Sequence, residues 1–269
     1  MRKGCLLAIV LVGVLVAGVV IVWTSSDRSR PAPGCSVTAA PGDGRPEFTF
    51  TPDGMGYAAT ITAVGTKLGM PEHATTIALA TALQESGLRN LPGGDRDSIG
   101  LFQQRPSQGW GKPDQLKDPV YAATAFYKRL AALPGWADLP VTVAAQAVQR
   151  SGAPDAYAQW EPTARAAAAA LTGQHPAALT CHDLKLGPPA ADLVSTANNE
   201  LGTAALSGTH PSARGWALSS WLVAHAAAFG VDQVSFEGRT WTAESGGWSG
   251  TPQPGAALSL HRAAPAPPS

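Results

Sequence analysis

The sequence predicts a mainly α-helical protein with a small α/β part near its C-terminus and a transmembrane helix at its N-terminus. Three observations lead to this prediction. The chain begins with an uncharged run at 6–23, apolar residues recur at intervals of three and four between residues 55 and 171, and two short strand-like segments flank the pair Glu237-Gly238. Spacings of three and four are typical of helices, whereas short apolar segments around a tight turn are typical of paired strands.

The N-terminal run is long enough to cross a membrane. Arg2 and Lys3 precede the eighteen residues LLAIVLVGVLVAGVVIVW. A spanning helix needs about 20 apolar residues, with a lower limit of about 17, whereas the core of a signal peptide has about 7 to 15. No convincing A-x-A cleavage site follows. We therefore interpret 1–23 as an uncleaved signal anchor that contacts the membrane through 6–23 and leaves the rest of the chain outside the cell. A cleaved signal and a buried core helix are the alternatives.

The remaining composition excludes some classes of partner. The chain carries 19 basic and 19 acidic residues and no basic block, whereas nucleic-acid-binding proteins usually carry a basic stripe. We therefore expect no nucleic-acid partner. The six histidines are scattered without the spacing of metal ligands, so no metal and no other cofactor is predicted. Cys35 and Cys181 form an even pair in an exported region, which predicts a disulfide.

A polar tether at 24–45 leads into a helical domain at 46–173. Its first helix has apolar residues at three- and four-residue intervals from Met55 and stops at Gly69. Pro71 begins the next helix, which runs to Gly87. Further helices are expected after Asp118-Pro119, after Pro140, and through EPTARAAAAAL up to Gly173.

The pattern changes after residue 173. We expect a linker at 174–189, a small α/β domain at 190–250 and a disordered, Pro-rich tail at 251–269. The small domain contains two helices, in AADLVSTANNELG and RGWALSSWLVAHAAAFG, followed by the strand pair around Glu237-Gly238. Its role does not follow from its residues, and a protein partner in the cell envelope is one possibility.

Glu85 lies where acids are uncommon, near the end of the apolar run IALATALQESG. A helix without a polar face is usually buried. Burial and the negative end of the helix dipole both favour the protonated form of a carboxyl group. A protonated acid is what general-acid cleavage of a glycoside needs. A solvated Glu at a frayed helix end is the structural alternative.

The two strings QESGLRN and DSIGLFQQRPSQGWG resemble the soluble lytic transglycosylase and goose-type lysozyme superfamily. The resemblance covers about 55–171, and it extends to an actinobacterial group of exported, lysozyme-like proteins. It implies a lysozyme-like helical domain with a short hairpin region, which acts on the β-1,4 linkage between the aminosugars of peptidoglycan glycan strands. Glu85 takes the acid role in this comparison. The resemblance gives cleft-lining roles to Ser98 and Gln103, and Gln104 beside them is also expected to contact substrate. Aromatic faces stack on sugar rings, so a glycan groove could also be lined by Phe102, Trp110, Tyr121 and Trp136, for each of which a place in the core is the alternative.

The chain departs from the transglycosylase pattern at one motif, which leaves the type of reaction open. Transglycosylases usually carry an A-Y-N-A-G motif in a later helix, whereas this chain reads AAQAVQRSG, so that Gln146 or Gln149 occupies the neighbourhood of the missing Tyr. We expect Gln149 to line the cleft and Tyr157 to reach it instead of that Tyr. A transglycosylase needs only Glu85, a muramidase would need a second carboxylate, for which Asp97 is the candidate, and a catalytically inactive glycan-binding or scaffold protein is the third possibility.

Overall fold

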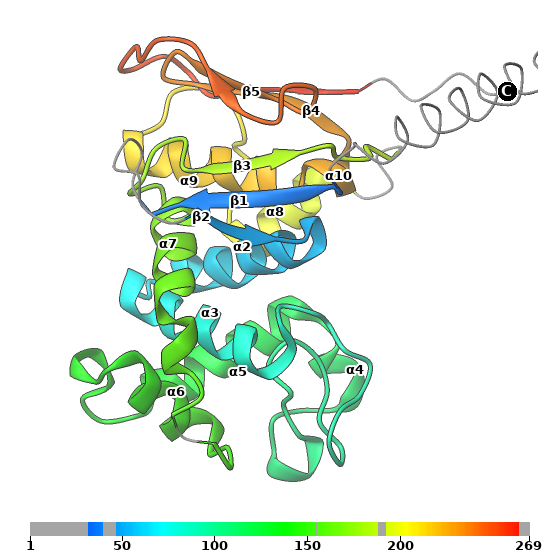
Figure 1. Ribbon diagram of the computed structural model, residues 1–269, viewed down its shortest axis with the longest axis vertical. Helices are drawn as coiled ribbons and strands as arrows, with labels where there is room; N and C mark the ends of the chain where they lie inside the picture. Colours follow the sequence, from blue (N-terminus) through cyan, green and yellow to red (C-terminus); the bar gives the residue numbers. More distant parts are fainter. Residues whose placement is uncertain (1–31, 40–46, 154, 188–191, 264–269) are drawn as a thin grey trace, which may run out of the picture. The chain divides into compact units, whose positions relative to one another are not determined.

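The computed structural model describes residues 32–39, 47–153, 155–187 and 192–263 (Figure 1). The predicted anchor at 1–23 and most of the predicted tether lie outside these residues. Within the described ranges, no helix is both long and apolar enough to cross a membrane. The described residues from Pro33 onward form one compact unit.

Helix α3 (Glu72–Ser86) is the central helix of the first half of this unit. All residues from Ala74 to Leu83 are buried, because α3 packs against α2 (Pro52–Lys67), α5 (Pro119–Ala131), α6 (Val141–Gln149) and α7 (Glu161–Leu171). A helix covered on so many sides needs no polar face, which explains its run of apolar and small residues. Gly87 ends α3 with a left-handed backbone, φ +63°, a conformation that costs glycine little.

The predicted helices of this region are confirmed, and their ends follow local chemistry. Thr51 caps α2 by accepting a hydrogen bond from Gly54 N at 3.1 Å, and Asp118 caps α5 by accepting one from Val120 N at 2.9 Å. Both caps precede a proline in the first helical turn, where its missing N–H has no cost. The short helix α4 (Pro113–Leu116) and three 3₁₀ turns complete the region: η1 (Pro106–Gln108), η2 (Trp136–Asp138) and η3 (Ala158–Trp160).

A three-stranded antiparallel sheet joins the two ends of this helical region. Its order is β2-β1-β3, with β1 at Gly34–Thr38, β2 at Glu47–Phe50 and β3 at Leu179–His182. Cys35 lies directly opposite Cys181 in the pairing of β1 with β3, and the two residues form the predicted disulfide. The sequence predicts a tether where β1 lies and a linker where β3 lies. Strands β1 and β3 pair with each other although they are more than a hundred residues apart in the chain. Local sequence patterns do not reveal such pairing.

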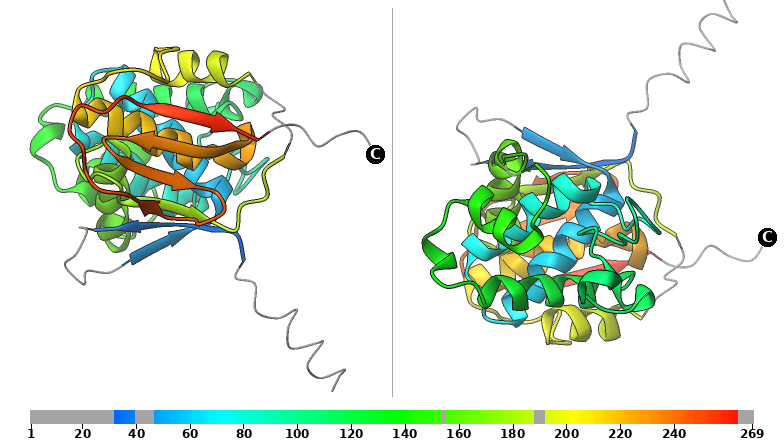
Figure 2. Two further views of the ribbon diagram at one scale, coloured as in Figure 1. Left: turned by 90° about the horizontal axis from the view of Figure 1, so that it is seen from above. Right: turned by 90° about the horizontal axis from the view of Figure 1, so that it is seen from below.

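The C-terminal part adds three helices and a second antiparallel sheet. The helices are α8 (Leu193–Leu201), α9 (Ser212–Ala224) and α10 (Ala226–Phe229). The sheet order is β6-β5-β4-β7, with β4 (Val231–Phe236), β5 (Arg239–Thr242), β6 (Trp248–Ser249) and β7 (Ser259–Arg262) (Figure 2). The strand pair around Glu237-Gly238 is confirmed as β4 and β5. Strand β7 lies within the predicted tail, where pairing with β4 orders it.

The described fold is therefore mixed, with helices and two small antiparallel sheets, rather than mainly α. Helix α9 packs against α2 and α7 on the one hand and against β3 and β4 on the other. Buried residues of both halves belong to one hydrophobic core, which includes Ile61, Leu79, Trp221 and Val234. The boundaries predicted at residues 173 and 190 fall inside this single unit.

Removing the disulfide should destabilise the whole unit. The two cysteines are separated by 146 residues, and a loop of that length gives about 5 kcal/mol in the chain-entropy account of disulfides. We expect the double variant Cys35→Ala, Cys181→Ala to lose roughly 3–5 kcal/mol of unfolding free energy in urea titrations. Reductant should lower the midpoint of the wild type and leave that of the double variant unchanged. Equal midpoints for the two proteins would contradict this role.

Candidate active site

A polar cleft of about 640 Å³ opens beside the C-terminal end of α3. Its volume is in the range of small-molecule binding sites. The residues that line it are Glu85, Asp95, Arg96, Ser98, Gln103, Arg105, Gln108, Trp110, Gln149, Arg150, Ser151 and Gly152. They come from the end of α3, the loop that follows it and the end of α6, so the cleft is formed by segments that are distant in sequence.

Glu85 occupies the last turn of α3 and is partly exposed to the cleft. The Tyr157 hydroxyl donates a hydrogen bond to Glu85 Oε1 at 2.6 Å. Among the described residues, the second carboxyl oxygen has no hydrogen-bond partner. One oxygen is thus held by the protein, and the other remains available to a molecule in the cleft.

Tyr157 is fully buried. Burial, followed by the hydrogen bond to Glu85 and the negative charge of Glu85, holds the pKa of Tyr157 well above its ordinary value. The phenol therefore stays protonated and remains a donor to Glu85 at neutral pH. Tyr157 thus contacts Glu85 but does not line the cleft, and its role in place of the missing motif Tyr stays a prediction.

The segment next to Tyr157 is attached to the same end of α3. Gln84 Oε1 accepts hydrogen bonds from Gln159 Nε2 at 3.1 Å and from Trp160 Nε1 at 2.9 Å. Neighbouring side chains of α3 thus bind neighbouring side chains around η3. These contacts limit how far Tyr157 can move relative to Glu85.

Ser86 connects α3 to the loop that follows the catalytic candidate. Its hydroxyl donates to Leu101 O at 2.7 Å and accepts from Arg89 N at 3.2 Å. The serine next to Glu85 is therefore a buried structural tie rather than a nucleophile. It joins the two resembling strings, one ending α3 and the other containing Leu101.

The predicted hairpin-like stretch is present as a tight turn. Ile99 and Gln104 exchange two backbone hydrogen bonds, at 2.9 and 3.0 Å. Gly100 lies in the turn with φ +80°, and a Cβ there would collide with the Leu116 carbonyl oxygen. Glycine is thus required at this position by conformation and by space.

The six predicted substrate-contacting residues divide into three groups. Ser98, Gln103 and Gln149 line the cleft, and Gln149 also donates to Phe102 O at 2.7 Å. Tyr157 contacts Glu85 but does not line the cleft. Phe102 and Gln104 are buried away from the cleft: Phe102 stacks on Phe126 with ring centroids 4.8 Å apart, and Gln104 Nε2 donates to Ala122 O at 3.1 Å. The tight turn directs Gln103 outward and its two neighbours into the core.

Asp97, the predicted second carboxylate, is held by the protein itself. It accepts hydrogen bonds from Arg105 Nε at 2.7 Å, Ser107 N at 2.8 Å and Ser107 Oγ at 3.0 Å. The Arg105 hydrogen bond, followed by those of Ser107, holds the pKa of Asp97 well below its usual range. Asp97 does not line the cleft, whereas Asp95 does. These contacts make Asp97 a brace of the loop, and its role as the second carboxylate of a muramidase stays a prediction.

The sequence did not predict the basic side chains of the cleft. Arg96, Arg105 and Arg150 all line it, and Arg105 is already paired with Asp97. Trp110 also contributes to the lining while it is nearly buried, with the Arg129 guanidinium 3.5 Å above its ring centroid. Trp110 is one of the aromatic residues that the sequence offers for a glycan groove, whereas Arg105 was missed, although its place inside the string QQRPSQGWG was an available signal.

The role of Asp97 as a brace has a consequence for stability as a function of pH. A lowered carboxyl pKa in the folded state stabilises the fold above the unfolded-state pKa of about 3.9, and this stabilisation is lost as pH falls through the folded-state pKa. We expect Asp97→Asn to unfold at a lower temperature than the wild type at pH 7 and pH 5. The gap should shrink below about pH 4. A gap that grows on acidification would contradict the assignment.

Neither a model of a known protein family nor a curated protein matches this sequence. The chemistry of the cleft is therefore argued from its own residues and their contacts.

Proposed function

We propose that this chain is an extracellular, membrane-anchored protein that cleaves peptidoglycan glycan strands by a lytic-transglycosylase-like mechanism. Glu85 is the single catalytic residue in this proposal. The observation that carries it is the hydrogen bond from Tyr157 to Glu85 Oε1, 2.6 Å, at the edge of a polar cleft of about 640 Å³. The strings that resemble lysozyme-like enzymes supply the substrate class.

In the first step Glu85 gives a proton to the oxygen of the β-1,4 linkage between the two aminosugars, and the bond from that oxygen to the anomeric carbon breaks. In the second step the Glu85 carboxylate takes a proton from the 6-hydroxyl of the sugar that carries this anomeric carbon. The oxygen of that hydroxyl then bonds to the anomeric carbon. The product carries a 1,6-anhydro ring, and Glu85 is protonated again. Tyr157 holds one oxygen, so that the other transfers the proton in both steps.

The surroundings of Asp97 favour this single-acid reaction over a muramidase that uses Asp97. A carboxylate that already accepts three hydrogen bonds, one of them from Arg105, is a weak base for activating water. Asp95 is the carboxylate that shares the cleft with Glu85. A hydrolase with Asp95 as its second carboxylate is therefore the competing enzymatic proposal, and its product would carry a reducing end.

The remaining lining of the cleft suits a hydrated polysaccharide. Ser98, Gln103, Gln108 and Gln149 offer hydroxyl and amide groups, which can both donate and accept hydrogen bonds with sugar hydroxyls. The uncharged run at 6–23 supports a location next to the cell wall, but it lies outside the described residues. A protein partner in the cell envelope for the C-terminal part also stays a proposal.

The central test uses the full-length chain, purified in detergent and incubated with isolated sacculi. We expect the wild type to release fragments with anhydro ends, detected by mass spectrometry, and Glu85→Gln to release them at least a hundred-fold more slowly, because the amide cannot transfer the proton. Asp97→Asn should retain the activity at temperatures where it is folded. Reducing ends that disappear in Asp95→Asn would favour the hydrolase.

Tyr157→Phe tests the hydrogen bond that carries the proposal. We expect the turnover rate to fall roughly ten- to hundred-fold, because the Glu85 carboxyl loses its fixed orientation. Tyr57→Phe is the matched control, since Tyr57 does not line the cleft. Its turnover should equal that of the wild type. Equal turnover in Tyr157→Phe would remove Tyr157 from the mechanism.

The inactive, glycan-binding alternative makes a different prediction for the same proteins. It requires that the wild type sediment with sacculi and release nothing above the rate of Glu85→Gln. Such a result would exclude both enzymatic proposals.

A further inference from the structure

A second pocket, of about 260 Å³, lies between α2, α8, α9 and α10 and shares no lining residue with the Glu85 cleft. We define it as the Glu200 pocket. Its lining consists of Pro52, Asp53, Gly56, Tyr57, Thr60, Pro119, Glu200, Ala224, His225, Ala227 and Ala228. Most of this lining is apolar and small, whereas its polar groups gather around Glu200. None of the functional roles considered above uses it.

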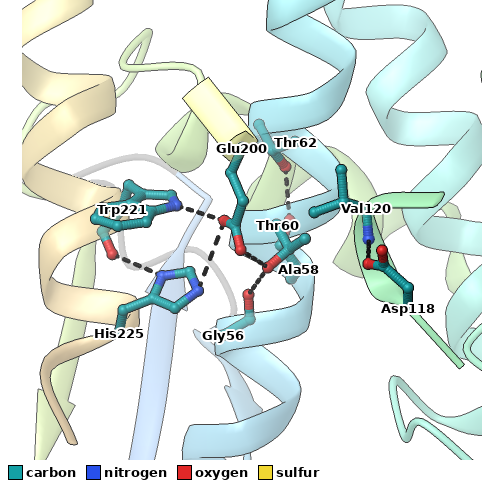
Figure 3. A network of polar contacts seen from close by, with 9 residues as sticks. All are labelled: Gly56, Ala58, Thr60, Thr62, Asp118, Val120, Glu200, Trp221 and His225. Atoms are coloured by element: carbon teal, nitrogen blue, oxygen red, sulfur yellow. Dashed lines mark hydrogen bonds and ion pairs between the residues drawn. The ribbon is translucent and has the colours of Figure 1, made fainter. Parts of the chain in front are cut away.

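Glu200 is a carboxylate of α8 that is only 6% exposed, yet it forms part of the pocket wall. Its Oε1 accepts a hydrogen bond from Thr60 Oγ1 at 3.0 Å, and its Oε2 accepts one from Trp221 Nε1 at 2.7 Å (Figure 3). A carboxylate has about four acceptor positions, so two stay open. Both donors are neutral, and a buried charge normally needs a charged partner.

His225 does not supply a close donor to this carboxylate. Its Nδ1 lies 3.0 Å from Trp221 O, and because a carbonyl oxygen only accepts, Nδ1 carries the hydrogen. In the neutral ring Nε2 is then an acceptor, and it lies 3.8 Å from Glu200 Oε2, beyond hydrogen-bond distance. A protonated ring forms an ion pair with Glu200 over this distance, which Figure 3 marks with a dashed line, whereas with a neutral ring two acceptors face the same space in the pocket wall. A donor with more than one N–H would satisfy both.

Gly56 keeps the space next to this pair open. At two other positions of α2, close packing leaves no room for a larger residue than glycine. A Cβ at Gly65 would lie 2.7 Å from the Tyr127 hydroxyl, and one at Gly54 would lie 3.0 Å from Thr51 Oγ1. A Cβ at Gly56 would meet nothing closer than Ala224 O at 3.7 Å and the His225 ring at 4.0 Å. Alanine is favoured over glycine inside a helix, so packing does not explain this glycine. The open space of the Glu200 pocket, which Gly56 helps to line, explains it.

We propose that the Glu200 pocket binds a small aliphatic ammonium group. Asp53 and Glu200 line it, and no Lys or Arg does, so the pocket favours a cation. The N–H groups of an ammonium match the open acceptor positions of Glu200 and, when the ring is neutral, the Nε2 of His225. The carbon chain of the ligand contacts the alanines and prolines of the wall. This proposal does not depend on the reaction at Glu85.

The test uses ¹⁹F NMR of the full-length chain, labelled with 5-fluorotryptophan and held in detergent. Trp221 reports on the Glu200 pocket through its bond to Glu200, and Trp110 reports on the Glu85 cleft. We expect n-butylamine to shift the Trp221 signal saturably. n-Butanol and butyrate, which have the same carbon chain without the cation, should not shift it at equal concentration.

Two variants separate binding from folding. Glu200→Gln should weaken the butylamine response at least ten-fold. Gly56→Leu places a side chain in the pocket without changing Glu200, and it should also weaken the response at least ten-fold while the thermal midpoint is retained. Gly247→Ala is the control, because a Cβ at Gly247 meets nothing within 4 Å and the residue is remote from the pocket lining. Its response should equal that of the wild type.

A further arm distinguishes the source of the ammonium. Nα-acetyl-lysine amide that binds more tightly than butylamine would assign the pocket to a lysine side chain, whereas weaker binding would assign it to a free amine. The proposal is overturned if butylamine shifts only the Trp110 signal, if butanol shifts Trp221 equally, or if Gly56→Leu leaves the response unchanged.

Discussion

The burial of α3 is the constraint on which the rest of the structure depends. Four helices cover it from Ala74 to Leu83, so its side chains must be apolar or small. Only its two ends are partly exposed to solvent, with Glu72 and His73 in the first turn and Gln84 and Glu85 in the last turn. A helix fixed along most of its length is a rigid support for a side chain at its end. The position of Glu85 therefore follows from the packing of the whole helical region, and substitutions in distant core residues would move it.

Polar ties then bring two distant segments to this end of α3. Tyr157 and Trp160 bind Glu85 and Gln84, and Leu101 O accepts from Ser86. Gln149 closes the other side by donating to Phe102 O. Each tie satisfies a polar group that would otherwise be buried without a partner, at a cost of about 1–3 kcal/mol. The geometry around the proposed acid is thus maintained by the same hydrogen bonds that stabilise the loops.

The C-terminal part belongs to the same core rather than to a loosely attached module. Trp241 and Trp248 donate hydrogen bonds from the second sheet to Cys181 O and Leu179 O of β3, at 3.2 and 2.8 Å. Glu200 joins α8 to α2 and α9. The two tryptophan contacts link strand β3 of the disulfide-bonded sheet to the second sheet. They also create the Glu200 pocket, which exists only because the two halves pack together.

Local patterns in the sequence were enough to determine the helices, their proline and glycine boundaries and the placement of Glu85 at a helix end. These features depend on residues a few positions apart. Tertiary structure alone decided the rest, because it depends on residues that meet across the fold. Asp95 and Asp97 are alike in sequence, but only Asp97 meets Arg105 and Ser107. Strands β1, β3 and β7 are short, and partners elsewhere in the chain order them. Tyr157 is 72 residues from Glu85, and only the docking of η3 on α3 brings its hydroxyl to that carboxyl.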